Sequence, residues 1–156
     1  MTEALKVGDL APEFDLPTDG RGQVRLPELK GQTVVLYFYP KDDTSGCTSE
    51  AKGFSEAAAA FKAAGAVVIG VSKDSVASHD KFKAKYALEL TLGADVEGAA
   101  VEAYGVWVEK SMYGRKYMGI DRSTFLIGPD GRLKAVWRKV KVPGHVDAVL
   151  AAVKAG

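Results

Sequence analysis

The sequence predicts an α/β fold in which the strands of a central sheet alternate with helices. Residues 34–39 form an unbroken run of β-branched and aromatic side chains, which is typical of a strand covered on both faces. A segment rich in Ala, Glu and Lys follows, and then a second apolar strand at residues 67–71. This alternation predicts parallel central strands joined by right-handed helical crossovers.

The elements follow in order along the chain. Residues 7–29 are dense in Gly, Pro and Asp, so we expect turns and short edge strands in an N-terminal extension. Pro40 ends the first central strand. Beyond it, apolar side chains at helical spacing predict three helices and one short helical turn. The helices are expected over residues 47–64, 76–87 and 145–154, and the turn over residues 101–104.

A hairpin is predicted near the end of the chain. Apolar segments at residues 124–127 and 133–137 flank Gly128-Pro129-Asp130-Gly131, a strong turn signal, so an antiparallel pair should make the central sheet mixed. Residues 138–142 partly alternate charged and apolar side chains, which predicts an edge strand. Because no repeat, low-complexity tract or linker is present, we expect one domain across residues 1–156.

Composition excludes several classes of function. The 21 Lys and Arg residues nearly balance the 20 Asp and Glu residues, which argues against nucleic acid as a partner. No apolar run approaches the roughly 18 residues of a membrane span, and the opening residues lack the apolar segment of a signal peptide. One cysteine forms neither an internal disulfide nor a Cys-rich zinc site. We therefore expect no metal, no cofactor and a reducing cytoplasmic location.

Cys47 is the residue of this sequence best placed for chemistry. It follows a predicted strand and loop at the start of a helix, where open α/β sheets bind their ligands. Unpaired amides and the positive helix end favour an anionic sulfur there. Thr44 lies three residues before Cys47 and Glu50 three residues after it, so the three side chains share one side if the helical turn extends that far. The Thr44 hydroxyl would then be able to donate to the thiolate.

The segment that surrounds Cys47 resembles the peroxidatic loop of peroxiredoxins, in particular that of the bacterioferritin comigratory protein (PrxQ) subfamily. The segment is Tyr37-Phe38-Tyr39-Pro40-Lys41-Asp42-Asp43-Thr44-Ser45-Gly46-Cys47-Thr48-Ser49-Glu50. Its proline, threonine and cysteine have the spacing of the family. The resemblance continues through residues 105–107, 109–114 and 119–127. It implies a thioredoxin-like fold, which agrees with the α/β pattern above.

The resemblance also implies a role for each site residue. Cys47 would be the peroxidatic nucleophile, and Arg122 would hold its thiolate. Thr44 would bond the sulfur and the peroxide, Pro40 would shield the sulfur from water, and Glu50 would orient Arg122. The substrate would be hydrogen peroxide or an alkyl hydroperoxide, and Cys47 would pass through a sulfenic acid.

The sequence departs from the subfamily at three positions. Ser45 stands where many members have proline, and Lys52 and Lys83 stand where members often place a resolving cysteine. Neither lysine can form a disulfide, so the resemblance implies a one-cysteine cycle. An external thiol, such as thioredoxin, glutaredoxin or a low-molecular-weight thiol, would restore Cys47. The resemblance favours a monomer.

Two alternatives use the same fold. Cys47 is a small buried apolar residue in one of them, as unpaired cysteines often are, and the protein is then a non-catalytic binding module with residues 110–117 as its partner surface. The other is a thiol-disulfide oxidoreductase, which the missing Cys-x-x-Cys pair argues against. His79 and His145 have no cysteine or carboxylate at ligand spacing, so we assign them neither a zinc site nor the role of base for Cys47.

Overall fold

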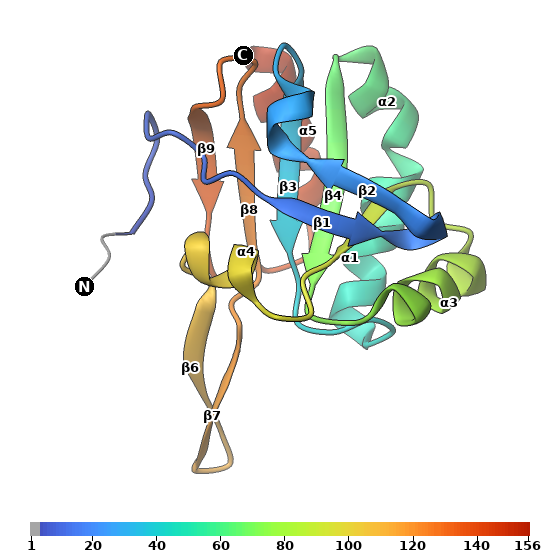
Figure 1. The fold of residues 1–156 in the computed structure, drawn as a ribbon, viewed down its shortest axis with the longest axis vertical. Helices are drawn as coiled ribbons and strands as arrows, with labels where there is room; N and C mark the ends of the chain where they lie inside the picture. Colours follow the sequence, from blue (N-terminus) through green and yellow to red (C-terminus); the bar gives the residue numbers. More distant parts are fainter. Residues whose placement is uncertain (1–3) are drawn as a thin grey trace.

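The computed structural model describes residues 4–156, which form a seven-stranded mixed sheet with helices against it (Figure 1). The strand order is β2-β1-β5-β4-β3-β8-β9. The central strands β3, β4 and β5 are parallel, whereas β8 and β9 are antiparallel to their neighbours. The predicted mixed α/β sheet is therefore confirmed. Its strands are β1 (Asp15–Thr18), β2 (Gly22–Arg25), β3 (Thr33–Phe38), β4 (Ala66–Ser72), β5 (Thr91–Ala94), β8 (Ser123–Ile127) and β9 (Leu133–Trp137).

The central strand β3 is buried on both faces, as its lack of polar alternation predicted. Val34, Leu36 and Phe38 enter one apolar core, and Val35 and Tyr37 enter the other. Side chains of α1, α2, α3 and α5 contribute to the second core, and those of α4 contribute to the first. The helices are α1 (Ser45–Glu56), α2 (Ala58–Ala63), α3 (Val76–Tyr86), α4 (Ala99–Ala103) and α5 (His145–Ala155), with short 3-10 turns η1 (Asp19–Arg21) and η2 (Leu26–Leu29).

One predicted helix and one predicted strand need correction. The helix expected over residues 47–64 is two helices, because Ala57 has φ −90° and ψ 4° and ends α1. The Ala-rich sequence carries no signal for this break. Residues 138–142 form no strand, because Lys139 has a left-handed φ of 49° that interrupts the extended backbone. The amide of Val140 instead donates to the carbonyl of Arg122 at 2.9 Å.

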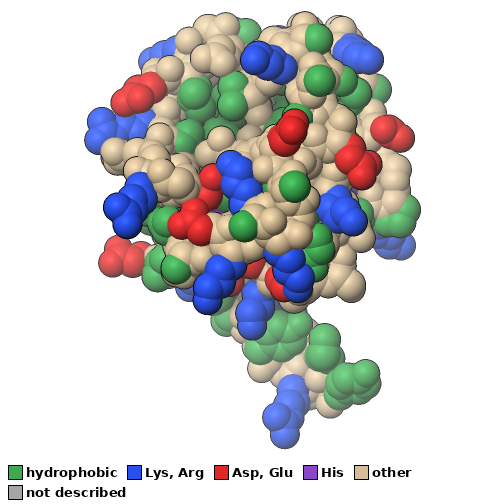
Figure 2. Space-filling model, turned by 90° about the vertical axis from the view of Figure 1, so that its right-hand side faces the viewer, with side chains coloured by type: hydrophobic (Ala, Val, Ile, Leu, Met, Phe, Trp, Pro, Cys, Tyr) green, Lys and Arg blue, Asp and Glu red, His purple; other side chains and the backbone are tan. Residues whose placement is uncertain are grey.

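A two-stranded ribbon extends from the body of the molecule. It consists of β6 (Trp107–Met112) and β7 (Arg115–Ile120), which pair antiparallel (Figure 1). Hydrophobic side chains gather on this projecting ribbon, with Lys and Arg side chains among them (Figure 2). The large exposed hydrophobic side chains of the ribbon and its turn are Met112, Tyr113, Tyr117 and Met118. In Figure 1 the ribbon points away from the sheet at the end where β3 and β4 finish.

No helix among residues 4–156 combines the length and the apolar character needed to cross a bilayer. Across the same described residues, no three His, Cys, Asp or Glu side chains gather closely enough to hold a metal ion.

Candidate active site

Cys47 lies in the first turn of α1, just beyond the carboxyl end of β3. Thr44 holds the extended N-cap conformation before this helix, and its carbonyl accepts the first helical hydrogen bond from the Thr48 amide at 2.8 Å. The Cys47 side chain is only 1% exposed. The sulfur is therefore almost fully covered, and a thiol on another molecule needs the surrounding chain to move before it can reach it.

Arg122 meets Cys47 because of the register of two strands. β8 runs antiparallel to β3 with Ser123 opposite Phe38, so Arg122 falls beside the start of α1. Its Nη2 donates a hydrogen bond to Cys47 Sγ at 3.3 Å. Burial alone would lower the pKa of Arg122. The attraction and hydrogen bonds of Glu50 and Cys47 outweigh this effect, so the pKa of Arg122 is raised. The guanidinium is thus a permanent positive charge against the sulfur.

Glu50 binds the other side of the same guanidinium. Arg122 Nη1 donates to Glu50 Oε1 at 2.7 Å, and the Glu50 side chain is fully buried. Burial raises the pKa of Glu50 to about 7, against the opposing attraction of Arg122. Its Oε2 has no hydrogen-bond partner among the described residues. One arginine therefore joins the sulfur to a buried carboxyl group that titrates near neutral pH.

Gly46 makes room for this arrangement, and the sequence analysis did not identify it as a site residue. A Cβ atom at this position would lie 3.1 Å from Arg122 Nη2, the nitrogen that donates to Cys47. The absent side chain lets the guanidinium approach the first turn of the helix. Nothing in the sequence marks Gly46 as different from an ordinary loop glycine, because the contact depends on a residue far along the chain.

The structure gives the Thr44 hydroxyl a different partner from the one that the resemblance implied. The Thr44 hydroxyl donates to the carbonyl of Lys41 at 2.9 Å, and the described residues show no hydrogen bond from it to the Cys47 sulfur. The hydroxyl proton is thus in use, while the oxygen lone pairs can still accept a proton from a bound ligand. Pro40 is exposed.

Lys110 is a further positive charge near the site. It lies in the middle of β6, opposite Tyr117 on β7, and is partly buried. Burial lowers its pKa, and the charge of Arg122 acts in the same direction, while Asp121 and Cys47 oppose it. In the sequence analysis Lys110 appeared only as the start of a possible partner surface. Its electrostatic effect on Cys47 depends on where the ribbon lies in the folded protein, and the sequence of the ribbon does not specify that position.

Neither histidine hydrogen-bonds to Cys47 among the described residues. His145 begins α5, and its Nε2 lies 2.7 Å from the Thr124 hydroxyl oxygen. Burial lowers the pKa of His145, and the charge of Arg122 lowers it further. Both effects favour the neutral ring, which shares a hydrogen bond with the Thr124 hydroxyl. His79 belongs to a separate buried network in the loop before α1.

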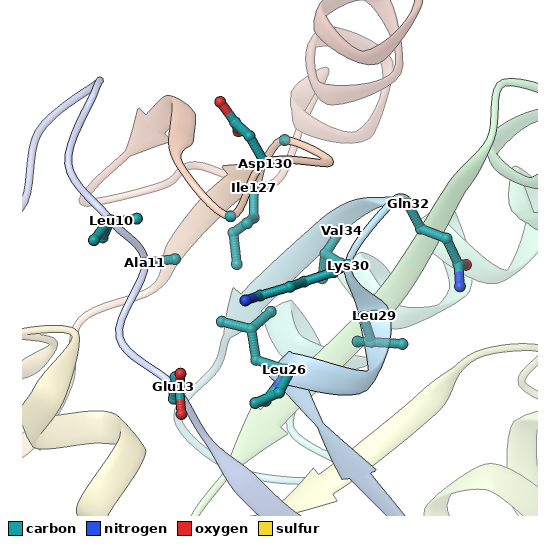
Figure 3. Close-up of a pocket in the computed structure, with 13 residues that line it drawn as sticks. Leu10, Ala11, Glu13, Leu26, Leu29, Lys30, Gln32, Val34, Ile127 and Asp130 are labelled. Carbon is teal, nitrogen blue, oxygen red and sulfur yellow. The ribbon is translucent and has the colours of Figure 1, made fainter.

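A largely apolar cavity elsewhere in the molecule is not part of this site. It has a volume of about 280 Å³ and lies at the amino end of β3, opposite the end that leads to Cys47 (Figure 3). Leu10, Leu26, Val34 and Ile127 form much of its wall, and Lys30 reaches across it. Its lining contains no cysteine, serine, threonine or histidine, so we do not place the chemistry there.

Comparison with known proteins identifies the family. Residues 7–136 match the AhpC/TSA family. A curated relative, the putative peroxiredoxin bcp of Coxiella burnetii, is 52% identical over 147 residues, which cover 94% of this chain and 97% of the relative. The curated peroxiredoxin Bcp of Bacillus subtilis is 47% identical over 150 residues and 96% of each chain. These relatives confirm the resemblance seen in the sequence.

Solved structures confirm the fold. Bacterioferritin comigratory protein of Xanthomonas campestris, studied for its alkyl peroxide reduction activity, aligns with a TM-score of 0.89 at 46% identity over 97% of this chain and 96% of that one. This similarity confirms the thioredoxin-like fold. It does not favour the alternative in which the protein is a non-catalytic binding module. The chain belongs to the AhpC/TSA family as a peroxiredoxin of the bacterioferritin comigratory protein (PrxQ) type, a thiol-dependent peroxidase with a single cysteine.

Proposed function

We propose that Cys47 is the peroxidatic nucleophile and that it reduces hydrogen peroxide and alkyl hydroperoxides. The observation that supports this assignment is the 3.3 Å hydrogen bond from Arg122 to a sulfur in the first turn of a helix. The guanidinium and the positive helix end both favour the thiolate, which is the reactive form. The alkyl class of substrate is supported by the X. campestris relative, whose structures concern alkyl peroxide reduction.

In the first step the Cys47 thiolate attacks the terminal oxygen of the hydroperoxide. A sulfur–oxygen bond forms, the oxygen–oxygen bond breaks, and the departing oxygen takes a proton from solvent to leave as water or an alcohol. Arg122 stabilises the negative charge on the departing oxygen, together with the free amides of the helix start. Glu50 orients Arg122 through the 2.7 Å hydrogen bond.

Thr44 and Pro40 complete the site. Because the Thr44 proton is donated to Lys41, its oxygen accepts the O–H of the incoming peroxide, which turns the terminal oxygen toward the sulfur. In this assignment Thr44 binds the peroxide and leaves the sulfur to Arg122. Pro40 limits the access of water to the sulfur.

The second half of the cycle needs a thiol from another molecule. The sequence has one cysteine, so a sulfenic acid at Cys47 has no partner in the same chain. A thiolate of thioredoxin, glutaredoxin or a low-molecular-weight thiol attacks the sulfenic sulfur, releases water and forms a mixed disulfide. A second thiol then cleaves this disulfide and regenerates Cys47. We propose that the protein does this as a monomer in the cytoplasm, where such thiols are reduced.

A peroxide-consumption assay tests the assignment. The wild-type protein should consume hydrogen peroxide and an alkyl hydroperoxide with at least one of these reductants, and Cys47→Ser should consume neither. Intact-mass analysis of peroxide-treated protein without reductant should show added oxygen on the monomer. A loss of two hydrogens from the monomer, or an active Cys47→Ser protein, would contradict the one-cysteine cycle.

A further inference from the structure

The loop that leads to Cys47 is fastened to α3 by two consecutive aspartates. Asp42 is buried, whereas Asp43 is exposed and has a left-handed φ of 59°. Asp43 accepts hydrogen bonds from Lys85 at 2.8 Å and from Tyr86 at 2.5 Å, both at the end of α3. These outer contacts face solvent, where an ion pair contributes little. The buried contacts of Asp42 therefore determine how firmly the loop is held.

The Asp42 carboxylate accepts three side-chain hydrogen bonds. Tyr39 donates to Oδ1 at 2.5 Å, and Ser78 and His79 donate to Oδ2 at 2.7 Å each. The backbone amide of Asp42 also donates to Asp74 at 2.8 Å. Three donors on one carboxylate stabilise its ionised form. Residues from the chain segment after β3, from the segment after β4 and from α3 thus converge on one loop residue.

His79 is fully buried and has an acceptor at each ring nitrogen. Its Nδ1 lies 2.7 Å from the Asp42 carboxylate, and its Nε2 lies 2.9 Å from the carbonyl oxygen of Gly93 on β5. A neutral imidazole has one N–H, so against an ionised Asp42 carboxylate and a carbonyl it leaves one lone pair facing an acceptor, whereas an imidazolium donates to both. The Tyr39 hydroxyl also lies 3.4 Å from Nδ1, but its proton is directed to Asp42 at 2.5 Å. The geometry therefore favours a positively charged His79.

The charges that face His79 agree with this conclusion. Burial alone would lower its pKa, but the hydrogen bond and charge of Asp42, the Gly93 carbonyl and the charge of Asp74 together raise the pKa. Burial likewise opposes ionisation of Asp42, but its bonds to His79 and Tyr39 lower its pKa overall. Both shifts favour the ionic form of the pair.

From this geometry we propose that His79 and Asp42 are positioning residues, forming a buried imidazolium–carboxylate clamp that fixes the loop and the first turn of α1 in the reactive conformation. The clamp acts through Thr44 and Cys47, which follow Asp42 in the same loop and helix start. It does not touch the peroxide. The proposal rests on the proposed peroxidatic role of Cys47 and adds a pH limit to it: loss of the His79 proton places a lone pair against an acceptor and releases the loop.

The experiment compares two identical substitutions at adjacent positions in the full-length protein. Asp42→Asn removes the buried charge, and Asp43→Asn removes the exposed charge at a left-handed position that Asn tolerates. The rate of Cys47 oxidation by hydrogen peroxide is measured against pH. Asp42→Asn should lose roughly tenfold at neutral pH, and its alkaline decline should move to lower pH. Asp43→Asn should keep the wild-type rate within about twofold.

Two readouts do not depend on peroxide chemistry. Nitrogen NMR of wild-type His79 should show two ring N–H groups at neutral pH. Hydrogen exchange of the Thr48 amide, which bonds to the Thr44 carbonyl, should be faster in Asp42→Asn and unchanged in Asp43→Asn. The NMR result stands even if Asp42→Asn does not fold.

The outcomes separate the two hypotheses. A single ring N–H on wild-type His79 would overturn the clamp, as would an Asp42→Asn protein with the wild-type pH profile and Thr48 exchange. A wild-type protein that does not react with peroxide would contradict the proposed function alone, because the NMR and exchange results would still decide the clamp.

Discussion

At the scale of single residues, Arg122 carries the largest part of the site's electrostatics, because one guanidinium serves two anionic groups. One nitrogen bonds Cys47 and the other bonds Glu50. A planar fork with separate donors suits this task, and a lysine ammonium does not reach two partners with the same geometry. The charge and the shape of Arg122 thus have separable effects on the sulfur.

Replacement of Arg122 distinguishes these two effects. Arg122→Ala should slow the reaction with peroxide by about 100-fold or more, because it removes a donor that stabilises the transition state. Arg122→Lys should fall between wild type and Arg122→Ala, since it keeps the charge without the fork. Rapid-mixing kinetics and the ultraviolet absorbance of the thiolate measure both. A lysine variant with the wild-type rate would show that charge alone suffices.

Glu50 should make stability depend on pH. Its pKa is raised by burial to about 7 in the folded protein, above the 4.5 of an exposed glutamate. The folded state therefore binds the proton more tightly, so this contribution to the free energy of unfolding is complete below about pH 4.5 and is lost as the pH rises through about 7.

Denaturant unfolding of wild type and Glu50→Gln tests this expectation. The amide keeps an acceptor for Arg122 but does not titrate. The difference in unfolding free energy between the two proteins should change across this pH range, with wild type losing stability as the pH rises. A difference that stays constant with pH would show that Glu50 does not titrate in the folded protein.

At the scale of elements, the sequence predicts what depends on local pattern. The buried strand β3 follows from its unbroken apolar run, and the hairpin of β8 and β9 follows from its Gly-Pro-Asp-Gly turn. The four-residue strand β5 gave no such signal, because it is short and contains Gly93. The break at Ala57 was missed because alanine favours helix on both sides of it.

The candidate active site could likewise be predicted only where it depends on local sequence. The position of Cys47 at a helix start could be predicted from neighbouring residues alone. Its contact with Arg122 could not, because it depends on the register between β3 and β8. The contact of Asp42 with His79 on α3 and the contact of His79 with Gly93 on β5 depend on packing over long sequence separations, so His79 had no visible role in the sequence. Family resemblance supplied Arg122 but not the actual acceptor of the Thr44 hydroxyl.

The N-terminus of α1 lacks the interactions that commonly stabilise a helix start. Thr44 makes no side-chain hydrogen bond that caps the helix, and Ser45 occupies the first helical position. Proline suits that position because the amide there has no helical partner, and the extended backbone of Thr44 is compatible with a following proline. The present sequence therefore leaves the first turn easier to open, which helps an external thiol reach a sulfur that is 1% exposed.

Ser45→Pro should make the first turn of α1 harder to open. The variant should be more stable by about 0.4–1 kcal/mol, because proline restricts the unfolded chain. Its oxidised form should react more slowly with a protein thiol, while its reaction with hydrogen peroxide changes little. Thermal unfolding and mixed-disulfide kinetics measure these effects, and Ser45→Ala controls for loss of the hydroxyl. Faster resolution in the proline variant would contradict the idea that the first turn must open.

At the scale of the whole molecule, β3 belongs to both apolar cores, since alternate side chains point to opposite faces of the sheet. Loss of one core exposes the strand that supports the other. We therefore expect residues 1–156 to unfold as one cooperative unit, in keeping with the prediction of one domain.

The two tryptophans provide the test. Trp107 packs against the first core and Trp137 against the second, so each reports on one face of the sheet. In Trp107→Phe and Trp137→Phe, fluorescence and far-ultraviolet circular dichroism should give coincident denaturant midpoints within each variant. Two separate transitions in either variant would show that the cores unfold independently.

The separation of Cys47 and Arg122 by 75 residues has a consequence for biosynthesis. A nascent chain that has emerged from the ribosome as far as Cys47 has no guanidinium to hold its sulfur, because Arg122 is translated much later. The stabilisation that Arg122 gives the sulfur arises only when β8 docks beside β3. Until then the sulfur lacks its guanidinium donor, and oxidants meet a less activated cysteine.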